Sequence, residues 1–378
     1  MSETPENELA RYDFHLPQEL IAQTPAARRV DARLMVVDRK NGTICHHYVR
    51  DFPDFLQPND CLVLNDTKVV PARLIGRRVR TGGRWEGLFL ETANADYASE
   101  FAHALTSQHG TDWVVMSKTR GKLMPGEKIE LQTPGLQTPD CRSGLFLETL
   151  AKLDDGNWLV RPLSDKNSGE KPFDFLERVG WVPIPPYIRN GRMVPPDKEQ
   201  YQTVYASKPG AIAAPTAGLH FSQELLQQIQ NKRVEIVPVT LHVGAGTFRP
   251  ISVRRLDDHV MHFEWGEISE QAVARIQKRK QSGGRVVAIG TTSVRLLESA
   301  SDEQHFLRPF SAKTNLFIRP GYIFRTVDAM LTNFHLPLST LMILVRTFGG
   351  DVLIREAYEE AIRNKYRFYS YGDAMLIL

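Results

Sequence analysis

The chain has 378 residues, of which 42% are hydrophobic and 24% are charged, and its formal net charge is +3. This composition is ordinary for a soluble globular protein, and the length favours two domains. The charge is too small to identify a nucleic-acid partner by itself, so a basic patch has to be sought locally.

Cysteine spacing and hydropathy exclude several classes of protein. Cys45, Cys61 and Cys141 form neither a CxxC metal pair nor an obvious disulfide framework, so we expect a reducing, cytoplasmic location. The acidic N-terminus lacks the basic and apolar regions of a signal peptide. The longest aliphatic run, residues 341–345, is far too short to span a bilayer, so we expect no membrane insertion.

The first seventy residues predict a β-hairpin and then a buried strand. Asn41-Gly42 separates two β-rich runs and tolerates the positive φ angles of a tight hairpin. The apolar run from Cys61 ends in the polar stretch 65–68, which includes Asn65 and Asp66. Residues 74–163 then carry many short apolar runs broken by turn residues, a texture typical of a small β-barrel or sandwich.

Beyond Pro172, strands and helices alternate. Ser222 is a good N-cap, and the residues after it have the apolar spacing of a helix. The pattern then predicts strands at 235–243 and 285–290 and helices at 270–283 and 293–300. This alternation indicates an α/β domain. We therefore expect a discontinuous, barrel-like α/β main domain over 1–72 and 170–378, with a small all-β barrel domain inserted at 73–169.

The segment "AIAAPTAGLHF" places small residues before a histidine. Thr216 and Gly218 lead to His220 at a predicted helix start, where free backbone N–H groups could bind an anion or a ligand oxygen. A tight loop with a hydrogen-bonded structural histidine explains the pattern equally well.

The segment "TLHVGAGTFRP" contains His242, Gly244, Gly246 and Thr247. Its glycines could let a ligand approach the backbone closely. Pro250 disfavours the helix that a dinucleotide-binding loop needs at this point. Taken alone, the segment indicates a structural turn more than a site.

Two further segments combine a strand, a turn and a helix start. In "AIGTTSVRLLE" the polar side chains are those of Thr291, Thr292 and Ser293, and in "LTNFHLPLSTL" they include Asn333 and His335. This geometry can bind anions, although ordinary helix capping is the commoner use of such residues.

The segment "HVMHFEWGE" contains His259, His262 and Glu264. Two histidines three residues apart could bind zinc, but HExxH spacing and a clear third ligand are missing. We therefore expect no metal site.

Two cationic stretches are candidates for RNA binding. At the end of the chain, basic and aromatic residues alternate, as suits phosphates and unstacked bases. A second run, "RRVRTGGR", lies at 77–84. The candidate RNA-binding residues are Arg77, Arg78, Arg80, Arg363, Lys365, Tyr366, Arg367 and Tyr371. The alternative is that the aromatic rings are core and the charges are solvated.

Taken together, these segments closely resemble the S-adenosylmethionine:tRNA ribosyltransferase-isomerase family of queuosine biosynthesis. The motifs that carry the resemblance are, in order, "LNDTKVVPARL", "YQTVYA", "AAPTAGLHF", "TLHVGAGTF", "GTTSVRLLE", "PGYIF", "LTNFHLPLSTL" and "YRFYSYGDAM". The resemblance extends from "YDFHLPQELIAQTP" to the C-terminus. Departures are Lys68, where arginine is common, Leu338, where lysine is usual, and "AKTNLFI", which is usually led by glycine.

The resemblance implies a specific reaction. The family transfers the ribosyl group of S-adenosylmethionine to the aminomethyl group of a 7-deazaguanine at the tRNA wobble position and isomerises it, releasing adenine and methionine. The implied co-substrate is S-adenosylmethionine with no metal, the implied partner is the tRNA anticodon loop, and we expect a monomer. The resemblance also implies an α/β domain with an inserted β-barrel.

The implied chemistry suggests roles for the polar residues. A base must remove an acidic C5′ proton beside the sulfonium, and a proton donor can assist the departure of adenine. The catalytic candidates are His220, His242, His335, Asp66 and Glu264, with His220 preferred as base because it follows a rigid small-residue loop. The expected donor-binding residues are Asn65, Thr216, Gly218, Gly244, Gly246, Thr247, Thr291, Thr292, Ser293 and Asn333.

Two other functions stay open at this point. A methyltransferase would use the same donor and leave S-adenosylhomocysteine, although the glycine loop–helix fingerprint is missing. A non-catalytic tRNA-binding protein would explain the basic–aromatic tail and the β-domain equally well.

Overall fold

The computed structural model describes residues 7–93, 112–134, 144–163, 171–244, 246, 251 and 253–378. The chain divides into two compact units, the first made of Met1–Lys68 with Pro185–Leu378 and the second of Val69–Ile184. The second unit is thus an insertion in the first. The exact boundaries expected from the sequence, 72/73 and 169/170, remain a prediction.

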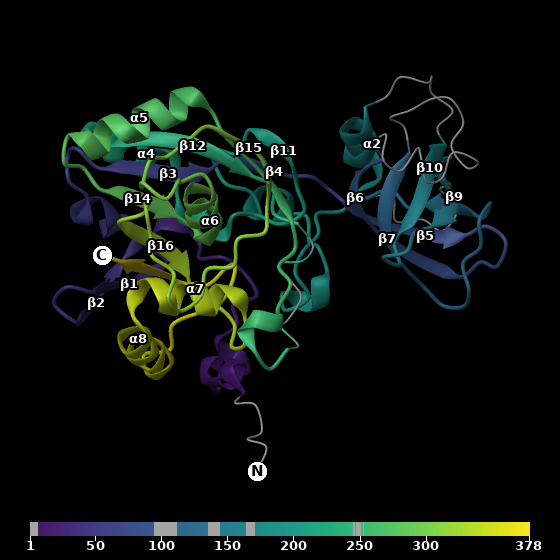
Figure 1. The fold of residues 1–378 in the computed structure, drawn as a ribbon. Coiled ribbons are helices and arrows are strands. Elements are labelled where there is room, and N and C mark those ends of the chain that lie inside the picture. The colour runs from purple at the N-terminus through teal and green to yellow at the C-terminus, as the bar shows by residue number, and fades with distance from the viewer. Residues whose placement is uncertain are drawn as a thin grey trace, which may run out of the picture. The chain divides into compact units, whose positions relative to one another are not determined.

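A nine-stranded mixed sheet forms the centre of the first unit, in the order β15-β13-β12-β3-β14-β16-β17-β1-β2 (Figure 1). Four neighbouring strands, β12, β3, β14 and β16, are parallel. The strands are β1 (Arg33–Asp38), β2 (Thr43–Tyr48), β3 (Cys61–Asn65), β12 (Glu235–Leu241), β13 (Glu264–Ile268), β14 (Val286–Ile289), β15 (Phe310–Thr314), β16 (Ala329–Asn333) and β17 (Ala374–Ile377). A short two-stranded sheet pairs β4 (Thr67–Val69) with β11 (Lys208–Ala211).

Both faces of the central strands are buried, which explains their continuous apolar sequences. Along β3, Cys61 and Val63 belong to one core cluster, and Leu62 and Leu64 belong to another. The helices of the first unit are α3 (Asp197–Gln200), α4 (Gln223–Asn231), α5 (Glu270–Gln281), α6 (Thr291–Ser299), α7 (Thr340–Gly349) and α8 (Asp351–Arg363). Helix α4 contributes to the second cluster, whereas α5 to α8 contribute to the first, so helices cover both faces of the sheet.

The local predictions in this unit are confirmed. Strands β1 and β2 form the hairpin, and Gly42 at its turn has φ 66°. The Ser222 side chain accepts a hydrogen bond from the Leu225 N–H and caps α4. Helix α6 begins at Thr291, two residues before the predicted start, because Gly290 with φ 87° ends β14 and turns the chain directly into the helix.

The second unit contains a closed antiparallel barrel in the order β10-β7-β6-β5-β8-β9. Its strands are β5 (Arg73–Arg78), β6 (Arg84–Thr92), β7 (Trp113–Thr119), β8 (Lys128–Leu131), β9 (Phe146–Lys152) and β10 (Trp158–Leu163), and helix α2 (Pro172–Val179) also belongs to this unit. Buried residues alternate with less buried ones along β6 and β9, which is the period of a strand with one face in the core. Trp85 and Trp113 are fully buried.

The α/β class and the inserted β-barrel are therefore confirmed, but the expected barrel-like main domain is not what the first unit forms. Among the described residues, the sheet ends in two edge strands, β15 and β2, which are not hydrogen-bonded neighbours. Antiparallel β13 and β15 end the sheet on one side and the β1–β2 hairpin ends it on the other, so the parallel run does not close on itself. In the part of the chain that the structure describes, no helix is long and apolar enough to cross a bilayer.

Candidate active site

A cavity of about 120 Å³ lies where the parallel strands β14 and β16 end. In α/β sheets, ligands bind outside the carboxyl ends of the strands, because the loops there differ in direction and leave a crevice. The lining residues are Tyr187, Tyr201, Ala213, Ala214, Pro215, Thr216, Ala217, Val243, Gly290, Thr291, Thr292, Thr332, Asn333, His335, Leu336, Ser339, Thr340, Leu341, Tyr369 and Ser370. Several predicted donor-binding residues thus come together here from segments far apart in the sequence.

The small-residue loop forms one wall and depends on glycine. It ends in a short 3-10 helix, Thr216–His220. A Cβ on Gly218 would lie 2.0 Å from the Tyr205 Oη, so no larger residue fits without displacing that ring. Gly218 therefore packs behind the loop rather than lining the cavity, and its role is steric.

His335 is the one catalytic candidate that lines the cavity. Its Nε2 lies 2.7 Å from the Thr332 Oγ1, and its backbone N–H donates to the Tyr358 Oη at 2.9 Å. Burial lowers the pKa of His335 to about 3, because desolvation penalises the imidazolium. The ring is therefore neutral at physiological pH.

His220, the preferred base, lies behind the cavity wall and is 4% exposed. Its Nε2 lies 3.1 Å from the Asn333 Nδ2. Burial first, and then the nearby charges of Arg367 and Arg29, lower its pKa to about 3. Because His220 does not line the cavity and already accepts a hydrogen bond, its placement weighs against the predicted role as the base.

Asp66 and His242 lie in a second polar group beside the ends of β3 and β12. The Asp66 carboxylate accepts hydrogen bonds from the Thr240 Oγ1 at 2.7 Å and the Ser207 Oγ at 2.8 Å. The His242 Nδ1 lies 2.7 Å from the Thr67 Oγ1. Burial lowers the pKa of His242, and the carboxylate of Asp66 acts in the opposite direction. Neither side chain lines the cavity.

Asn65, the last residue of β3, hydrogen-bonds to Leu241, the last residue of the neighbouring strand β12. It is 1% exposed, its Oδ1 accepts the Leu241 N–H at 3.0 Å, and its Nδ2 donates to the Leu241 carbonyl at 2.9 Å. A weaker contact of 3.4 Å reaches the Thr292 Oγ1 at the cavity. The structure thus gives Asn65 a structural function, although it was predicted to bind the donor.

Glu264 is buried and forms an ion pair with Arg295. Its other oxygen accepts the Gly244 N–H at 2.9 Å, so this carboxylate fixes the backbone three residues after the end of β12. A Cβ on Gly246 would lie 2.3 Å from the His262 ring. Thr247 lies outside the described residues.

At the start of α6, the three residues that were predicted to bind the donor differ in whether they line the cavity. Thr291 and Thr292 line the cavity. The Ser293 Oγ instead donates to the Ile289 carbonyl at 2.8 Å and is fully buried. Ser293 therefore neither lines the cavity nor caps α6, whose first turn has no side-chain cap, and of the three residues only the two threonines line the cavity.

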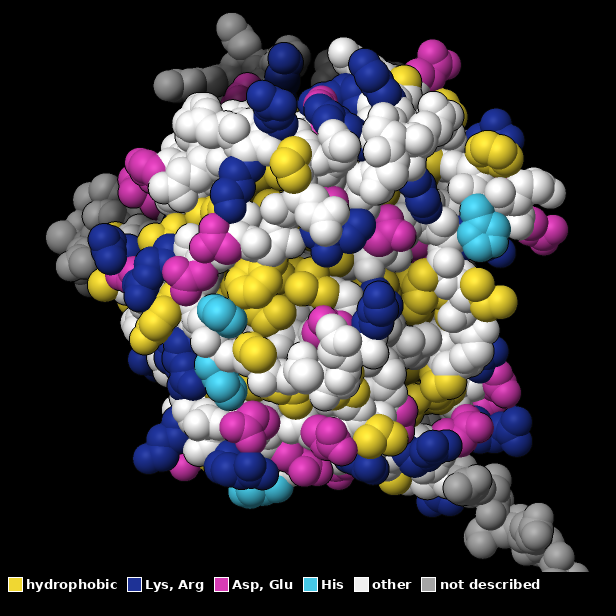
Figure 2. Space-filling model, turned by 90° about the vertical axis from the view of Figure 1, so that its left-hand side faces the viewer, with side chains coloured by type: hydrophobic (Ala, Val, Ile, Leu, Met, Phe, Trp, Pro, Cys, Tyr) yellow, Lys and Arg dark blue, Asp and Glu magenta, His cyan; other side chains and the backbone are white. Residues whose placement is uncertain are grey.

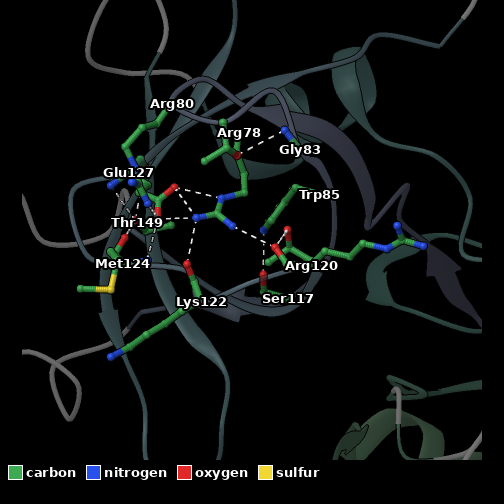
Figure 3. A network of polar contacts seen from close by, with 12 residues as sticks. Arg78, Arg80, Gly83, Trp85, Ser117, Arg120, Lys122, Met124, Glu127 and Thr149 are labelled. Atoms are coloured by element: carbon green, nitrogen blue, oxygen red, sulfur yellow. Dashed lines mark hydrogen bonds and ion pairs between the residues drawn. The ribbon is translucent and has the colours of Figure 1, made fainter.

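The predicted cationic run in the barrel divides into buried and exposed members. Arg78 is 3% exposed, pairs with Glu127 at 2.7 Å and donates to the carbonyls of Arg120 and Lys122 (Figure 3). It fastens the strand β5 to the segment before β8 and is unavailable to RNA. Arg77 and Arg80 are exposed, although Arg80 also reaches Glu127 at 3.2 Å.

The two tyrosines proposed for RNA binding, Tyr366 and Tyr371, are core, as the alternative explanation held. Tyr366 is fully buried with its Oη 2.8 Å from the His46 Nδ1, and the Tyr371 Oη donates to Asp197. Arg363 and Lys365 are exposed, and Arg367 is partly exposed. The face shown in Figure 2 carries basic and acidic side chains interspersed rather than one basic field.

Several residues that line the cavity were not predicted from the sequence to belong to the site. Tyr201 and Tyr369 occur in the motifs "YQTVYA" and "YRFYSYGDAM", so the motifs are a signal for them, whereas Tyr187 has none. Among the described residues, no group of three or more His, Cys, Asp or Glu side chains could hold a metal ion.

Comparisons with known proteins cover nearly the whole chain. Residues 9–377 match the family described as "Queuosine biosynthesis protein". The chain is 44% identical over 364 residues to the S-adenosylmethionine:tRNA ribosyltransferase-isomerase of Acetivibrio thermocellus, covering 96% of this chain and 98% of that protein, and 46% identical over 367 residues to that of Pelobacter propionicus, covering 97% and 98%.

A solved structure is also similar. The S-adenosylmethionine tRNA ribosyltransferase of Thermotoga maritima is 30% identical, with a TM-score of 0.51, and the match covers 97% of this chain and all of that one. The sequence motifs, the fold and these relatives lead to one conclusion. The chain belongs to the S-adenosylmethionine:tRNA ribosyltransferase-isomerase family of queuosine biosynthesis.

Proposed function

We propose that this chain transfers the ribosyl group of S-adenosylmethionine to the aminomethyl group of the 7-deazaguanine at the tRNA wobble position and isomerises it to the epoxycyclopentanediol. The observation that carries the proposal is the cavity at the ends of β14 and β16. Its lining combines tyrosines, small residues and a few polar side chains, a composition that suits a nucleoside. Their motifs are those that mark the family.

The bonds that change define what the site must do. The S–C5′ bond breaks and methionine leaves with its electrons, one C5′–H bond loses its proton, and the glycosidic C–N bond breaks to release adenine, which takes up a proton. A C1′–C5′ bond closes the five-membered carbon ring, the aminomethyl nitrogen gives up a proton and bonds to a ribosyl carbon, and the ring oxygen of the ribose becomes the epoxide oxygen. The positive sulfonium makes the C5′ protons acidic, so a neutral base beside C5′ can start the sequence.

His335 is the residue we assign to proton removal. His335 lines the cavity, and its imidazole is neutral at physiological pH, so one ring nitrogen has a lone pair that can take up a proton. For this role the Nε2 carries the hydrogen and donates it to the Thr332 Oγ1, which leaves the Nδ1 lone pair free. Thr291 and Thr292 supply hydroxyl groups that can bind the ribosyl oxygens.

The partners follow from the same reaction. S-adenosylmethionine is the only co-substrate, no metal takes part, and the protein works as a cytoplasmic monomer on the anticodon loop. The candidates for phosphate contacts are the exposed cations Arg363 and Lys365, the partly exposed Arg367, and Arg77 and Arg80 of the barrel. Residues 73–169 form the inserted domain in this proposal.

Product analysis tests the function. The protein is incubated with S-adenosylmethionine and tRNA that carries the 7-aminomethyl-7-deazaguanine, and adenine, methionine and S-adenosylhomocysteine are measured. Equal amounts of adenine and methionine are expected. S-adenosylhomocysteine would instead identify a methyltransferase, and binding of tRNA without any product would identify a tRNA-binding protein.

A further inference from the structure

Asn333, the last residue of β16, lines the cavity with a side-chain oxygen that has no hydrogen-bond partner in the described part of the chain. The residue is 2% exposed. A buried carbonyl oxygen without a partner costs about 1–3 kcal/mol, so native structures rarely keep one without a reason. A ligand that brings a hydrogen-bond donor would remove this cost.

The orientation of the Asn333 amide is determined by its neighbours. The Nδ2 donates to the Tyr369 carbonyl oxygen at 3.0 Å and faces the His220 Nε2 at 3.1 Å. The Tyr369 carbonyl can only accept, so the nitrogen must lie on that side, and both of its hydrogens are then used. The Oδ1 is the atom that Asn333 can offer to a ligand.

His220 completes this arrangement. Its Nε2 can accept from Asn333 only if it is unprotonated, and burial keeps the ring neutral by lowering its pKa to about 3. His220 itself does not line the cavity. It therefore acts on a ligand through Asn333.

The wall beside Asn333 is aromatic. The rings of Tyr187 and Tyr369 stack with centroids 4.4 Å apart and planes inclined by 28°, and both line the cavity. Tyr369 has φ 70°, a conformation that a bulky residue rarely adopts. This turn brings the Tyr369 carbonyl to Asn333 while its ring stays at the cavity.

We propose that the Asn333 Oδ1 accepts a hydrogen bond from the exocyclic amino group of a purine-like base held in this cavity, and that His220 is a positioning residue which orients Asn333. The inference rests on the proposed function, because the reaction offers two such bases. One is the adenine of S-adenosylmethionine, and the other is the 7-deazaguanine of the tRNA.

The test measures the ratio of the affinities for two ligands that differ only in the amino group, rather than the affinity for one ligand. Calorimetry compares binding of 5′-deoxy-5′-methylthioadenosine with that of its counterpart lacking the 6-amino group. For the wild type we expect about tenfold tighter binding of the amino compound, as one hydrogen bond to a buried acceptor provides. In Asn333→Ala the ratio should fall to about one. A variant that is merely loosened loses both affinities equally and keeps the ratio.

His220 is tested by the same ratio together with turnover. His220→Ala should lower the preference, and His220→Gln, whose side-chain oxygen can accept from the Asn333 Nδ2, should restore it along with most of kcat. If His220 were instead the base, His220→Gln would keep the ratio and lose turnover by about 10²-fold or more. That result would overturn the positioning role.

A second pair of ligands distinguishes the two sources. The free base 7-aminomethyl-7-deazaguanine is compared with its counterpart lacking the 2-amino group. An Asn333-dependent ratio in this pair, and not in the adenine pair, assigns the cavity to the tRNA base, which also supports the proposal. Ratios unchanged by Asn333→Ala in both pairs would overturn it. If the wild type released adenine from S-adenosylmethionine in that case, the proposed function would stand and only this inference would fail.

Discussion

The Nε2 of His335 lies 2.7 Å from the Oγ1 of Thr332, the residue three positions before it at the end of β16. The hydroxyl therefore restrains the rotation of the one histidine among the catalytic candidates that lines the cavity. A base held in one orientation by a neighbouring group removes a proton faster than a freely rotating one, because its geometry is already that of the reaction.

Replacing His335 tests its assignment as base. His335→Gln should retain binding of S-adenosylmethionine and tRNA but lose both adenine release and exchange of the C5′ hydrogens with deuterated solvent. A lost general base typically costs about 10²–10⁴-fold in rate. Mass spectrometry of the recovered donor measures the exchange. Turnover within a few-fold of the wild type would return attention to His220, His242, Asp66 and Glu264.

The Thr332 hydroxyl can be removed without changing the shape of its side chain. Thr332→Val should lower kcat, because His335 loses the acceptor that holds its Nε2 hydrogen, while KM for S-adenosylmethionine changes little. Thr332→Ser keeps the hydroxyl and is the matched control, so its kcat should stay close to that of the wild type. Steady-state kinetics of the two variants decide the matter, and equal losses in both would show that only packing matters at this position.

The two neutral histidines predict a pH dependence of stability. His220 and His335 have folded pKa values of about 3, below the ordinary value of 6.5, so the unfolded chain binds more protons than the folded one between these values. The contribution of these histidines to the free energy of unfolding is fully present above pH 6.5. For each histidine it falls by about 1.4 kcal/mol for every pH unit as the pH drops towards 3. Urea unfolding at pH 7 and pH 5 measures this loss. His335→Gln should show a smaller loss than the wild type, and an equal loss would contradict the buried neutral state.

Gly218 should tolerate no side chain. A Cβ at this position would lie 2.0 Å from the Tyr205 Oη and 2.9 Å from the Thr203 Cγ2. Gly218→Ala should lower the free energy of unfolding by about 1–3 kcal/mol, the usual cost of overpacking. Adding Tyr205→Phe removes the clashing oxygen and should recover part of the loss in urea denaturation. No recovery would indicate that the loop backbone, and not the tyrosine, limits the space.

The exposed cations near the C-terminus are predicted to touch tRNA phosphates. Changing Arg363, Lys365 and Arg367 together to alanine should weaken tRNA binding and reduce its salt dependence. A protein that contacts fewer phosphates releases fewer counterions when it binds. Donor affinity should stay nearly constant. Lys40→Ala, at the exposed turn of the β1–β2 hairpin, serves as the charge control. An unchanged salt slope in the triple variant would shift the proposal to Arg77 and Arg80.

Removal of metals should leave the reaction intact. The proposed chemistry uses only side chains and the two substrates, so exhaustive chelation followed by return of magnesium for tRNA folding should restore full turnover. Metal analysis of the active protein is the accompanying measurement. Zinc present in stoichiometric amount and lost together with activity would contradict the prediction.

Local sequence determined the secondary structure and the class of fold. The Asn41-Gly42 turn, the serine cap of α4 and the continuous apolar strands are short-range features, because backbone sterics, capping and hydrophobic runs act over a few residues. The family motifs likewise stand in the sequence by themselves. What local patterns did not indicate is that the main sheet ends in antiparallel strands on both sides instead of closing, because strand order depends on contacts between distant segments.

Only the tertiary structure decided which of the marked residues meet. The same kind of residue has opposite surroundings at positions that look alike in the sequence. His335 lines the cavity while His220 lies behind it, Thr292 lines the cavity while Ser293 bonds back to the last residue of β14, and Arg78 is buried while Arg77 is exposed. Hydrogen-bond partners and exposure are set by side chains that arrive from elsewhere in the chain. Tyr369 from the C-terminal segment thus orients Asn333 at the end of β16, a relationship that no spacing of residues could predict.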